Sequence, residues 1–304
     1  MFQFAKSASL ALLTSLLATS SALACACGCA VFDVGTSTLL PAGPGGTAFL
    51  EYDFLNQTTN WSGSSHAPKA NNDDKHIRSD FMLAGGQYMF NDSWGAMAEI
   101  PVTHRAFTTA DSGTEETFNH TALGDIRLMG VYSGFSSAMD TGVIFGVKLP
   151  TGDHTYKNFD ADVEIGSGST DVLLGAYHTG ALNPDQTWTY FVQGMWQHEV
   201  ATQDHYRPGQ EINGAAGVSY SNWSVGDWGI APVFQVLLSY RGHDGGIGDP
   251  DNTGYTRLLV SPGLAVTKGA WKIYSDVEVA TAQHVTGNQL IAPVAVKFIV
   301  SRSF

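Results

Sequence analysis

The sequence predicts an all-β protein, a transmembrane antiparallel up-and-down β-barrel of about twelve strands. Three observations lead to this fold class: period-two polarity along segments of about ten residues, connections that alternate between long and short, and aromatic residues gathered at the ends of the segments. Only 14% of the residues are charged, and 34 of the 304 are glycine. Typical soluble domains carry about 25% charged residues and about 7% glycine, but a soluble acidic protein could share this balance, so composition alone does not decide the class.

The N-terminus predicts export. Residues 1–24 combine one early lysine, an apolar run and the small-residue site Ala22-Leu23-Ala24, which together are typical of a cleaved signal peptide. The apolar run is too short for a membrane-spanning helix, which needs about 20 apolar residues. We therefore expect a signal peptide at 1–24, a periplasmic N-terminal segment with the cysteines at 25–45, and a barrel at 46–304.

Period-two polarity places the strands. In the segment 271–279, Trp271 and Ile273 are apolar, whereas Lys272 and Asp276 alternate with them. Successive side chains of a strand point to opposite faces, so such a segment has one apolar and one polar surface. The predicted strands are 46–56, 76–90, 93–106, 123–135, 140–150, 168–180, 187–200, 210–220, 227–241, 254–267, 270–281 and 289–304.

The connections between the predicted strands fall into two length classes. Short ones such as Asn91-Asp92 and Lys268-Gly269 alternate with long ones. Transmembrane barrels have short periplasmic turns and longer extracellular loops, so this pattern predicts a bacterial outer-membrane barrel with both termini in the periplasm. We expect the loops at 57–75, 107–122 and 151–167 to shape the external mouth, with 242–253 on the same side.

The last strand ends in Phe304 and has apolar residues at alternate positions. It resembles the C-terminal signal of bacterial outer-membrane barrels. The barrel-assembly machinery, outer-membrane lipid and lipopolysaccharide are therefore expected partners.

The polar faces carry charges of both signs. A lysine or arginine facing lipid at the membrane midplane costs about 2–4 kcal/mol, so we expect these charges to face the lumen. They are Glu51, Asp53, Arg78, Asp80, Glu99, Arg105, Asp125, Arg127, Lys148, Asp171, Arg257, Lys272, Asp276, Glu278 and Lys297. Strand parity alone gives the candidates for the lumen and solute pathway: Glu99, Arg105, Asp125, Arg127, Lys148 and Asp171.

Other inward positions are apolar. They are Val233, Leu237, Phe191, Met195, Leu173 and Ile299. A lumen that mixes apolar and charged residues suits a small hydrophobic solute, and twelve strands enclose less room than a 16-stranded porin. The predicted function is a channel for passive uptake or efflux of small hydrophobic or aromatic molecules. The alternatives are a metal-binding or electron-transfer accessory barrel and a non-conducting structural barrel.

Three motifs carry a family resemblance. They are Leu123-Gly124-Asp125-Ile126-Arg127-Leu128, Gly146-Val147-Lys148-Leu149-Pro150-Thr151-Gly152-Asp153 and Ile165-Gly166-Ser167-Gly168-Ser169-Thr170-Asp171-Val172-Leu173-Leu174-Gly175. Over about 120–180, the chain resembles the outer-membrane proteins grouped with the phenol-degradation meta-pathway transporters. The resemblance implies a barrel and transport of hydrophobic or aromatic compounds, without naming a substrate. Physically, we interpret the two later motifs as a loop hinge, because proline stops a strand and glycine and serine favour turns.

The three cysteines, Cys25, Cys27 and Cys29, follow the predicted cleavage site directly. Alternate residues of an extended chain bring their sulfurs to one side, and soft thiolates suit Cu or Zn. Lipidation of Cys25 and a local or intermolecular disulfide are the other hypotheses, since an odd count leaves one thiol over.

Two classes of function are disfavoured. A net charge of −13 argues against nucleic-acid binding, which needs a basic face. The chain has no G-x-S-x-G, H-E-x-x-H, P-loop or dinucleotide motif, so we expect no enzyme.

Overall fold

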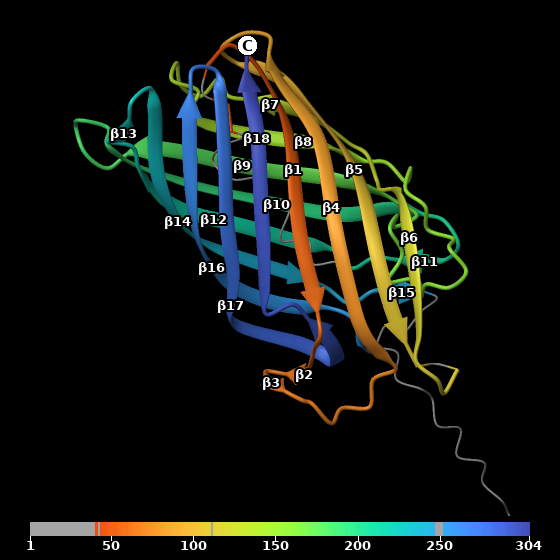
Figure 1. The fold of residues 1–304 in the computed structure, drawn as a ribbon. Coiled ribbons are helices and arrows are strands. Elements are labelled where there is room, and N and C mark those ends of the chain that lie inside the picture. The colour runs from red at the N-terminus through yellow and green to blue at the C-terminus, as the bar shows by residue number, and fades with distance from the viewer. Residues whose placement is uncertain (1–39, 42, 111, 247–251) are drawn as a thin grey trace, which may run out of the picture.

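The structure is a computed structural model that describes residues 40–41, 43–110, 112–246 and 252–304. The expected signal peptide and Cys25, Cys27 and Cys29 lie outside these residues. The described chain forms one antiparallel β-barrel, which closes where β1 (Gly45–Gln57) pairs with β18 (Val294–Ser303) (Figure 1). The predicted fold class is confirmed.

The wall follows chain order. Between β1 and β18 it contains β4 (Asp74–Met89), β5 (Trp94–Thr109), β6 (Glu116–Leu123) continued by β7 (Arg127–Tyr132), β8 (Thr141–Lys148), β9 (Ser169–Ala181), β10 (Trp188–Thr202), β12 (Glu211–Tyr220), β14 (Trp228–Arg241), β16 (Tyr255–Lys268) and β17 (Trp271–Ile291). Short strands lie in the connections: β2 (Thr59–Gly63), β3 (Ser65–His66), β11 (Tyr206–Arg207), β13 (Trp223–Val225) and β15 (Gly245–Gly246). With β6 and β7 counted as one interrupted strand, the described wall has twelve strands.

The barrel has two unlike ends. The connections 90–93, 182–187 and 269–270 are short and lie at the end that carries Phe304, which we call the turn end. The connections 149–168 and 203–210 lie at the other end, which we call the loop end. Among the described residues, no helix has the length and apolar character needed to cross a bilayer.

Two predicted strands differ from the structure. The prediction of one strand at 123–135 is wrong, because the chain leaves the ladder at 124–126 and β6 and β7 each pair with a different part of β5. There the Thr151 hydroxyl bonds both the carbonyl of Gly124 and the amide of Ile126. The prediction of a strand from 289 is also wrong, since β17 bends at the loop end and pairs its last residues with β2.

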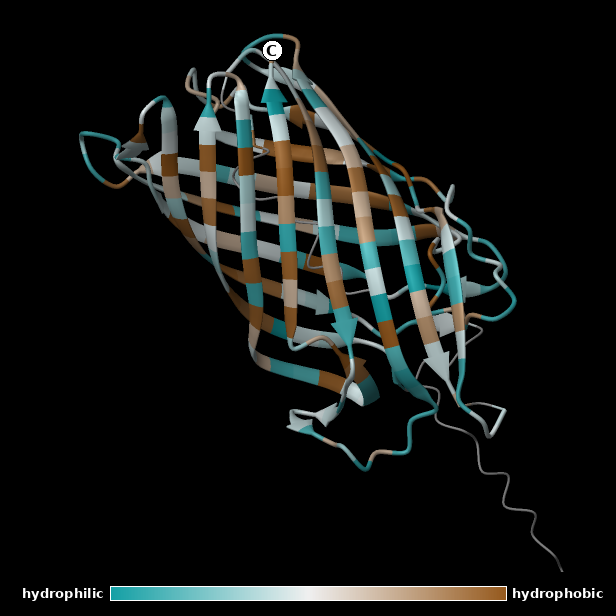
Figure 2. Cartoon of the chain, in the orientation of Figure 1, coloured by the Kyte–Doolittle hydropathy of each residue, from teal (hydrophilic) through white to brown (hydrophobic). Residues whose placement is uncertain are grey.

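The outer face of the barrel is apolar. In β18, Val294, Val296 and Phe298 are exposed, whereas Ala295 and Lys297 between them are buried inside. Figure 2 shows this alternation as brown and teal bands along the strands. Tryptophans ring the turn end at the first residues of four strands: Trp94, Trp188, Trp228 and Trp271. Such a ring is typical of a membrane interface.

Arg78 and Asp80 correct the prediction that all the charges face the lumen. They share the outer face of β4 with exposed Met82, and the Arg78 side chain is 52% exposed. Arg78 lies 3.1 Å from Asp80, which accepts a hydrogen bond of 2.6 Å from Tyr52. Both residues lie toward the loop end, where the cost of a lipid-facing charge falls to about 0–1 kcal/mol near the interface.

The connection 149–168 folds into the barrel. Phe159 and Val163 are buried against Ile77, Phe107 and Leu290 from β4, β5 and β17. The connection expected to shape an external mouth thus packs inside the loop end of the barrel, where its apolar side chains are buried between the strands. All six predicted inward apolar residues are buried or packed inside the barrel.

Candidate functional site

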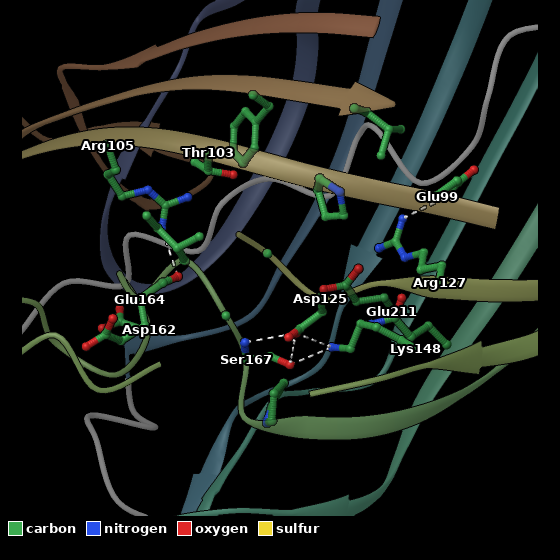
Figure 3. A pocket seen from close by; sticks show the side chains of 18 of the residues that line it. Glu99, Thr103, Arg105, Asp125, Arg127, Lys148, Asp162, Glu164, Ser167 and Glu211 are labelled. Carbon is green, nitrogen blue, oxygen red and sulfur yellow. Dashed lines mark hydrogen bonds and ion pairs between the residues drawn. The ribbon is translucent and has the colours of Figure 1, made fainter. Parts of the chain in front are cut away.

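A cavity of about 200 Å³ lies inside the barrel beneath the inserted connection. Strands β4 and β5 line one side of it, and β8, β10, β12 and β14 contribute to the other side (Figure 3). Its lining includes Phe81, Leu83, Glu99, Pro101, Arg105, Asp125, Arg127, Lys148, Asp162, Glu164, Ile165, Ser167, Gln197, Glu211 and Arg241. The cavity joins residues from both halves of the sequence.

Lys148 is the centre of a buried ionic network. Its Nζ atom lies 2.7 Å from Asp171 Oδ2 and 3.6 Å from Asp125 Oδ2, and it donates to the Ser167 hydroxyl at 2.7 Å. The lysine side chain is only 7% exposed. Gln197 donates to the second acid, Asp171, at 2.6 Å. Because every charge has an opposite charge and further hydrogen bonds, the desolvation cost of the group is offset.

Asp125 fixes both ends of the inserted connection. It accepts a hydrogen bond from the amide of Gly152 at 3.0 Å. It also accepts one from the amide of Ser167 at 2.9 Å (Figure 3). A Cβ atom on Gly152 would lie 2.6 Å from Gly166, so this close approach of two backbones requires glycine. The interpretation of the two motifs as a loop hinge agrees with this geometry. The same segment also reaches the cavity through Ser167.

Arg105 holds the inserted connection from the wall of β5. Its guanidinium donates to the carbonyl oxygens of Val163 and Glu164, the latter at 3.1 Å, and to the Ser79 hydroxyl at 3.0 Å. A further pair on the same wall joins Arg127 to Glu99 at 3.7 Å. Arg105 on β5 therefore holds the backbone of the inserted connection in place, and we call this contact the Arg105 clamp.

The far wall has its own ion pairs. Arg241 lies 3.4 Å from Glu211 and 2.8 Å from Asp244, which also accepts a hydrogen bond of 2.5 Å from Tyr206. Burial is the main cause that raises the pKa of the Tyr206 hydroxyl in the β10–β12 connection. The ion pairs of the cavity thus form three separate groups around its wall, centred on Lys148, Arg127 and Arg241.

The inserted connection is also tied to β6. The Asp153 carboxylate bonds His120 at 2.8 Å, and this hydrogen bond is the main cause that lowers the Asp153 pKa. The His120 ring stacks on Tyr156 at 4.1 Å. Among the described residues β6 pairs with β5 alone, so the connection rather than a further strand borders its other side.

Glu164 gives the inserted connection a pH dependence. Burial and the nearby Asp153 raise its pKa from the usual 4.5 to about 8. The inserted form therefore binds an additional proton between these values, and its stability falls as the pH rises through this range toward 8. We expect protease cleavage of the 149–168 connection to increase from pH 6 to pH 9 in wild type and to stay constant in Glu164→Gln. An equal increase in the variant would contradict this assignment.

The structure places the predicted lumen residues together. Glu99, Arg105, Asp125, Arg127 and Lys148 line the cavity, and Asp171 lies directly behind Lys148. Gln197, Glu211 and Arg241 also line the cavity. The period-two pattern of their strands, β10, β12 and β14, could have predicted their inward positions. Asp162, Glu164, Ile165 and Ser167 have no such signal, because they reach the cavity from a loop. Among the described residues, no group of three histidine, cysteine or acidic side chains could hold a metal ion.

Comparisons with known proteins agree on the fold. No protein-family model and no curated protein sequence matches the chain. Among solved structures, the COG4313 outer membrane channel from Pseudomonas putida F1 is similar with a TM-score of 0.66 and 13% identity, over 89% of this chain and 100% of that one. The beta domain of the Bordetella autotransporter BrkA is similar with a TM-score of 0.51 and 9% identity, over 86% of this chain and 100% of that one. The chain thus has the fold of the bacterial outer-membrane β-barrels.

Proposed function

We propose that this protein is a bacterial outer-membrane channel for the passive passage of small hydrophobic or aromatic molecules. The observation that carries the proposal is a cavity inside the barrel where apolar side chains lie beside charges held in three groups of ion pairs. Because ion pairs hold these charges to one another, a solute would contact mainly the apolar side chains of the lining. These are Phe81, Leu83, Pro101 and Ile165. Small-molecule sites commonly combine apolar side chains with polar groups that orient the ligand.

The size of the cavity supports a solute of one aromatic ring. An apolar protein cavity of about 150 Å³ accommodates benzene. The volume of about 200 Å³ found here is slightly larger. Phe81 adds an aromatic ring to the wall, and aromatic pairs gain about 0.5–1.5 kcal/mol beyond the burial of their surface.

Two further observations support the location and the class. The outer face is apolar with aromatic residues at the turn end, which suits a bilayer. The solved structure from Pseudomonas putida F1 is described as an outer membrane channel. The autotransporter domain has a similar fold, so the channel proposal depends on the cavity and not on the fold alone.

Planar-bilayer recordings test the proposal. Purified protein is expected to conduct ions, and phenol is expected to interrupt that current reversibly because it occupies the cavity. Absence of any current, with correct heat-modifiable migration of the barrel, would instead support the structural alternative.

Filling the cavity gives a matched test. Leu83→Trp places a large ring in the lumen, and we expect it to reduce the current and abolish the effect of phenol. Ala84→Trp places the same ring on the outer face of the same strand, where Ala84 is exposed. This control is expected to keep the wild-type current and its response to phenol. Equal behaviour of the two variants would place the solute pathway elsewhere.

A further inference from the structure

Most of the methionines of this chain gather at one place. The sequence has seven methionines, and five of them pack together inside the barrel near the turn end. These five form what we call the methionine cluster: Met89, Met97, Met129, Met139 and Met195. Three of them are buried, at 1–6% exposure, while Met97 and Met195 are partly exposed on the lumen side.

The strand register places two of the methionines on facing positions. Met97 on β5 lies directly opposite Met129 on β7, and such pairs have Cβ atoms about 4.5–5.5 Å apart. Two glycines on neighbouring strands then leave room. A Cβ atom on Gly146 would lie 2.7 Å from Met129 Cγ, and one on Gly175 would lie 3.2 Å from Met195 Sδ. The side chains of Met129 and Met195 therefore extend from opposite sides over β8 and β9.

Met139 joins the cluster from a strained position. It lies in the β7–β8 connection with a φ of 53°, a left-handed conformation that costs a residue other than glycine about 1–3 kcal/mol. Its carbonyl accepts a hydrogen bond of 3.2 Å from Tyr177, a member of the same packed group. The fold thus keeps the Met139 side chain packed inside the barrel, although its backbone conformation is unfavourable.

The chemistry of the cluster is specific. Thioethers are soft, neutral ligands that select Cu(I) among biological metals, and Ag(I) shares this preference. Leucine or isoleucine would bury a similar apolar surface but would supply no soft donor atom. The three cysteines supply a second set of soft donors in the same chain. Leu40, which packs against the cluster, follows Cys29 by eleven residues, and an extended chain of that length spans up to about 36–40 Å.

We infer that the methionine cluster is a binding site for a soft monovalent metal ion, Cu(I), in the lumen at the turn end of the barrel. The two partly exposed residues, Met97 and Met195, face the lumen and admit the ion, and buried Met129 completes its thioether ligands. This site is separate from the charged cavity, and it does not depend on whether that cavity conducts a solute.

The test removes sulfur without removing apolar volume. All measurements use full-length protein with Cys25, Cys27 and Cys29 changed to serine, so that thiolates do not contribute. Cu(I) is titrated without oxygen against a chromophoric chelator, and Ag(I) serves as a redox-inert second probe. We expect one equivalent of Cu(I) per barrel, with sulfur neighbours in its X-ray absorption spectrum, and at least about tenfold weaker binding in Met129→Leu, Met195→Leu.

Leucine is a suitable replacement because exchange of methionine and leucine in a core costs less than about 1.5 kcal/mol. Heat-modifiable migration checks that each variant is folded. The matched control is Met82→Leu, which removes a thioether that is 53% exposed on the outer face. It is expected to leave Cu(I) binding unchanged. Equal binding in the double variant and the control, or no binding in the parent, would overturn the inference and leave the cluster as apolar packing or as a contact for aromatic solutes.

Discussion

Replacing residues 155–163 with a short Gly-Ser linker is expected to raise the single-channel conductance several-fold. This segment contains Tyr156, Phe159 and Val163, which fill the lumen at the loop end, and it ends next to the Arg105 clamp. The parts of the chain on either side of the replaced segment lie close together, because the amide of Gly166 donates to the carbonyl of Asp153 at 2.7 Å. A short linker can therefore close the gap and leave the hinge at Asp125 intact.

Planar-bilayer recording measures this effect under identical salt conditions. The matched control shortens the β5–β6 turn at 112–115, which lies at the same end but is exposed and outside the packed cluster. Its conductance is expected to equal that of wild type. Should both variants conduct like wild type, the inserted connection is not the constriction.

Lys148→Met is expected to destabilise the barrel by about 3–5 kcal/mol, because it leaves the buried carboxylates of Asp125 and Asp171 without their cation. The change keeps most of the side-chain volume, so the loss reports on charge. Urea unfolding in lipid vesicles, followed by tryptophan fluorescence, measures it. The triple variant with Asp125→Asn and Asp171→Asn is expected to recover much of the stability, because no unpaired charge remains.

Lys272 provides the control for this experiment. It also points inward, but at the turn end, and no ion pair within 4.0 Å is found for it among the described residues. Lys272→Met is therefore expected not to lower the unfolding free energy, because it removes a partly buried cation that has no such ion pair. If Lys272→Met lowered the unfolding free energy as much as Lys148→Met, the loss would follow from removing any inward lysine. It could then not be attributed to the ion pairs of Lys148 with Asp125 and Asp171.

Strand parity predicted the fold and much of the site because a β-strand has a strict period of two. Glu99, Arg127 and Lys148 could be placed inside from that period alone. Arg78 could not, because parity separates two faces and does not tell where along the strand the apolar belt ends. The assignment of its face required the extent of the membrane-facing surface, which is a property of the whole barrel.

Loop residues were less predictable for a different reason. Glu164 and Ser167 reach the cavity only because the chain turns inward after Lys148, and that turn depends on contacts with Asp125 and Arg105 from distant strands. Gly152 and Gly166 were a usable signal, since paired glycines at both ends of a loop permit a close backbone approach. The methionine cluster had no local signal, because its members come from four strands and a turn.

The inward position of the 149–168 connection constrains the order of assembly. Phe159 and Val163 are enclosed by Ile77 on β4, Phe107 on β5 and Leu290 on β17. The seam between β1 and β18 completes the wall around them and joins residues from the two ends of the barrel sequence. An open seam gives the loop a wider entrance to the lumen than the finished end of the barrel, so we expect the loop to take its interior place before β1 pairs with β18.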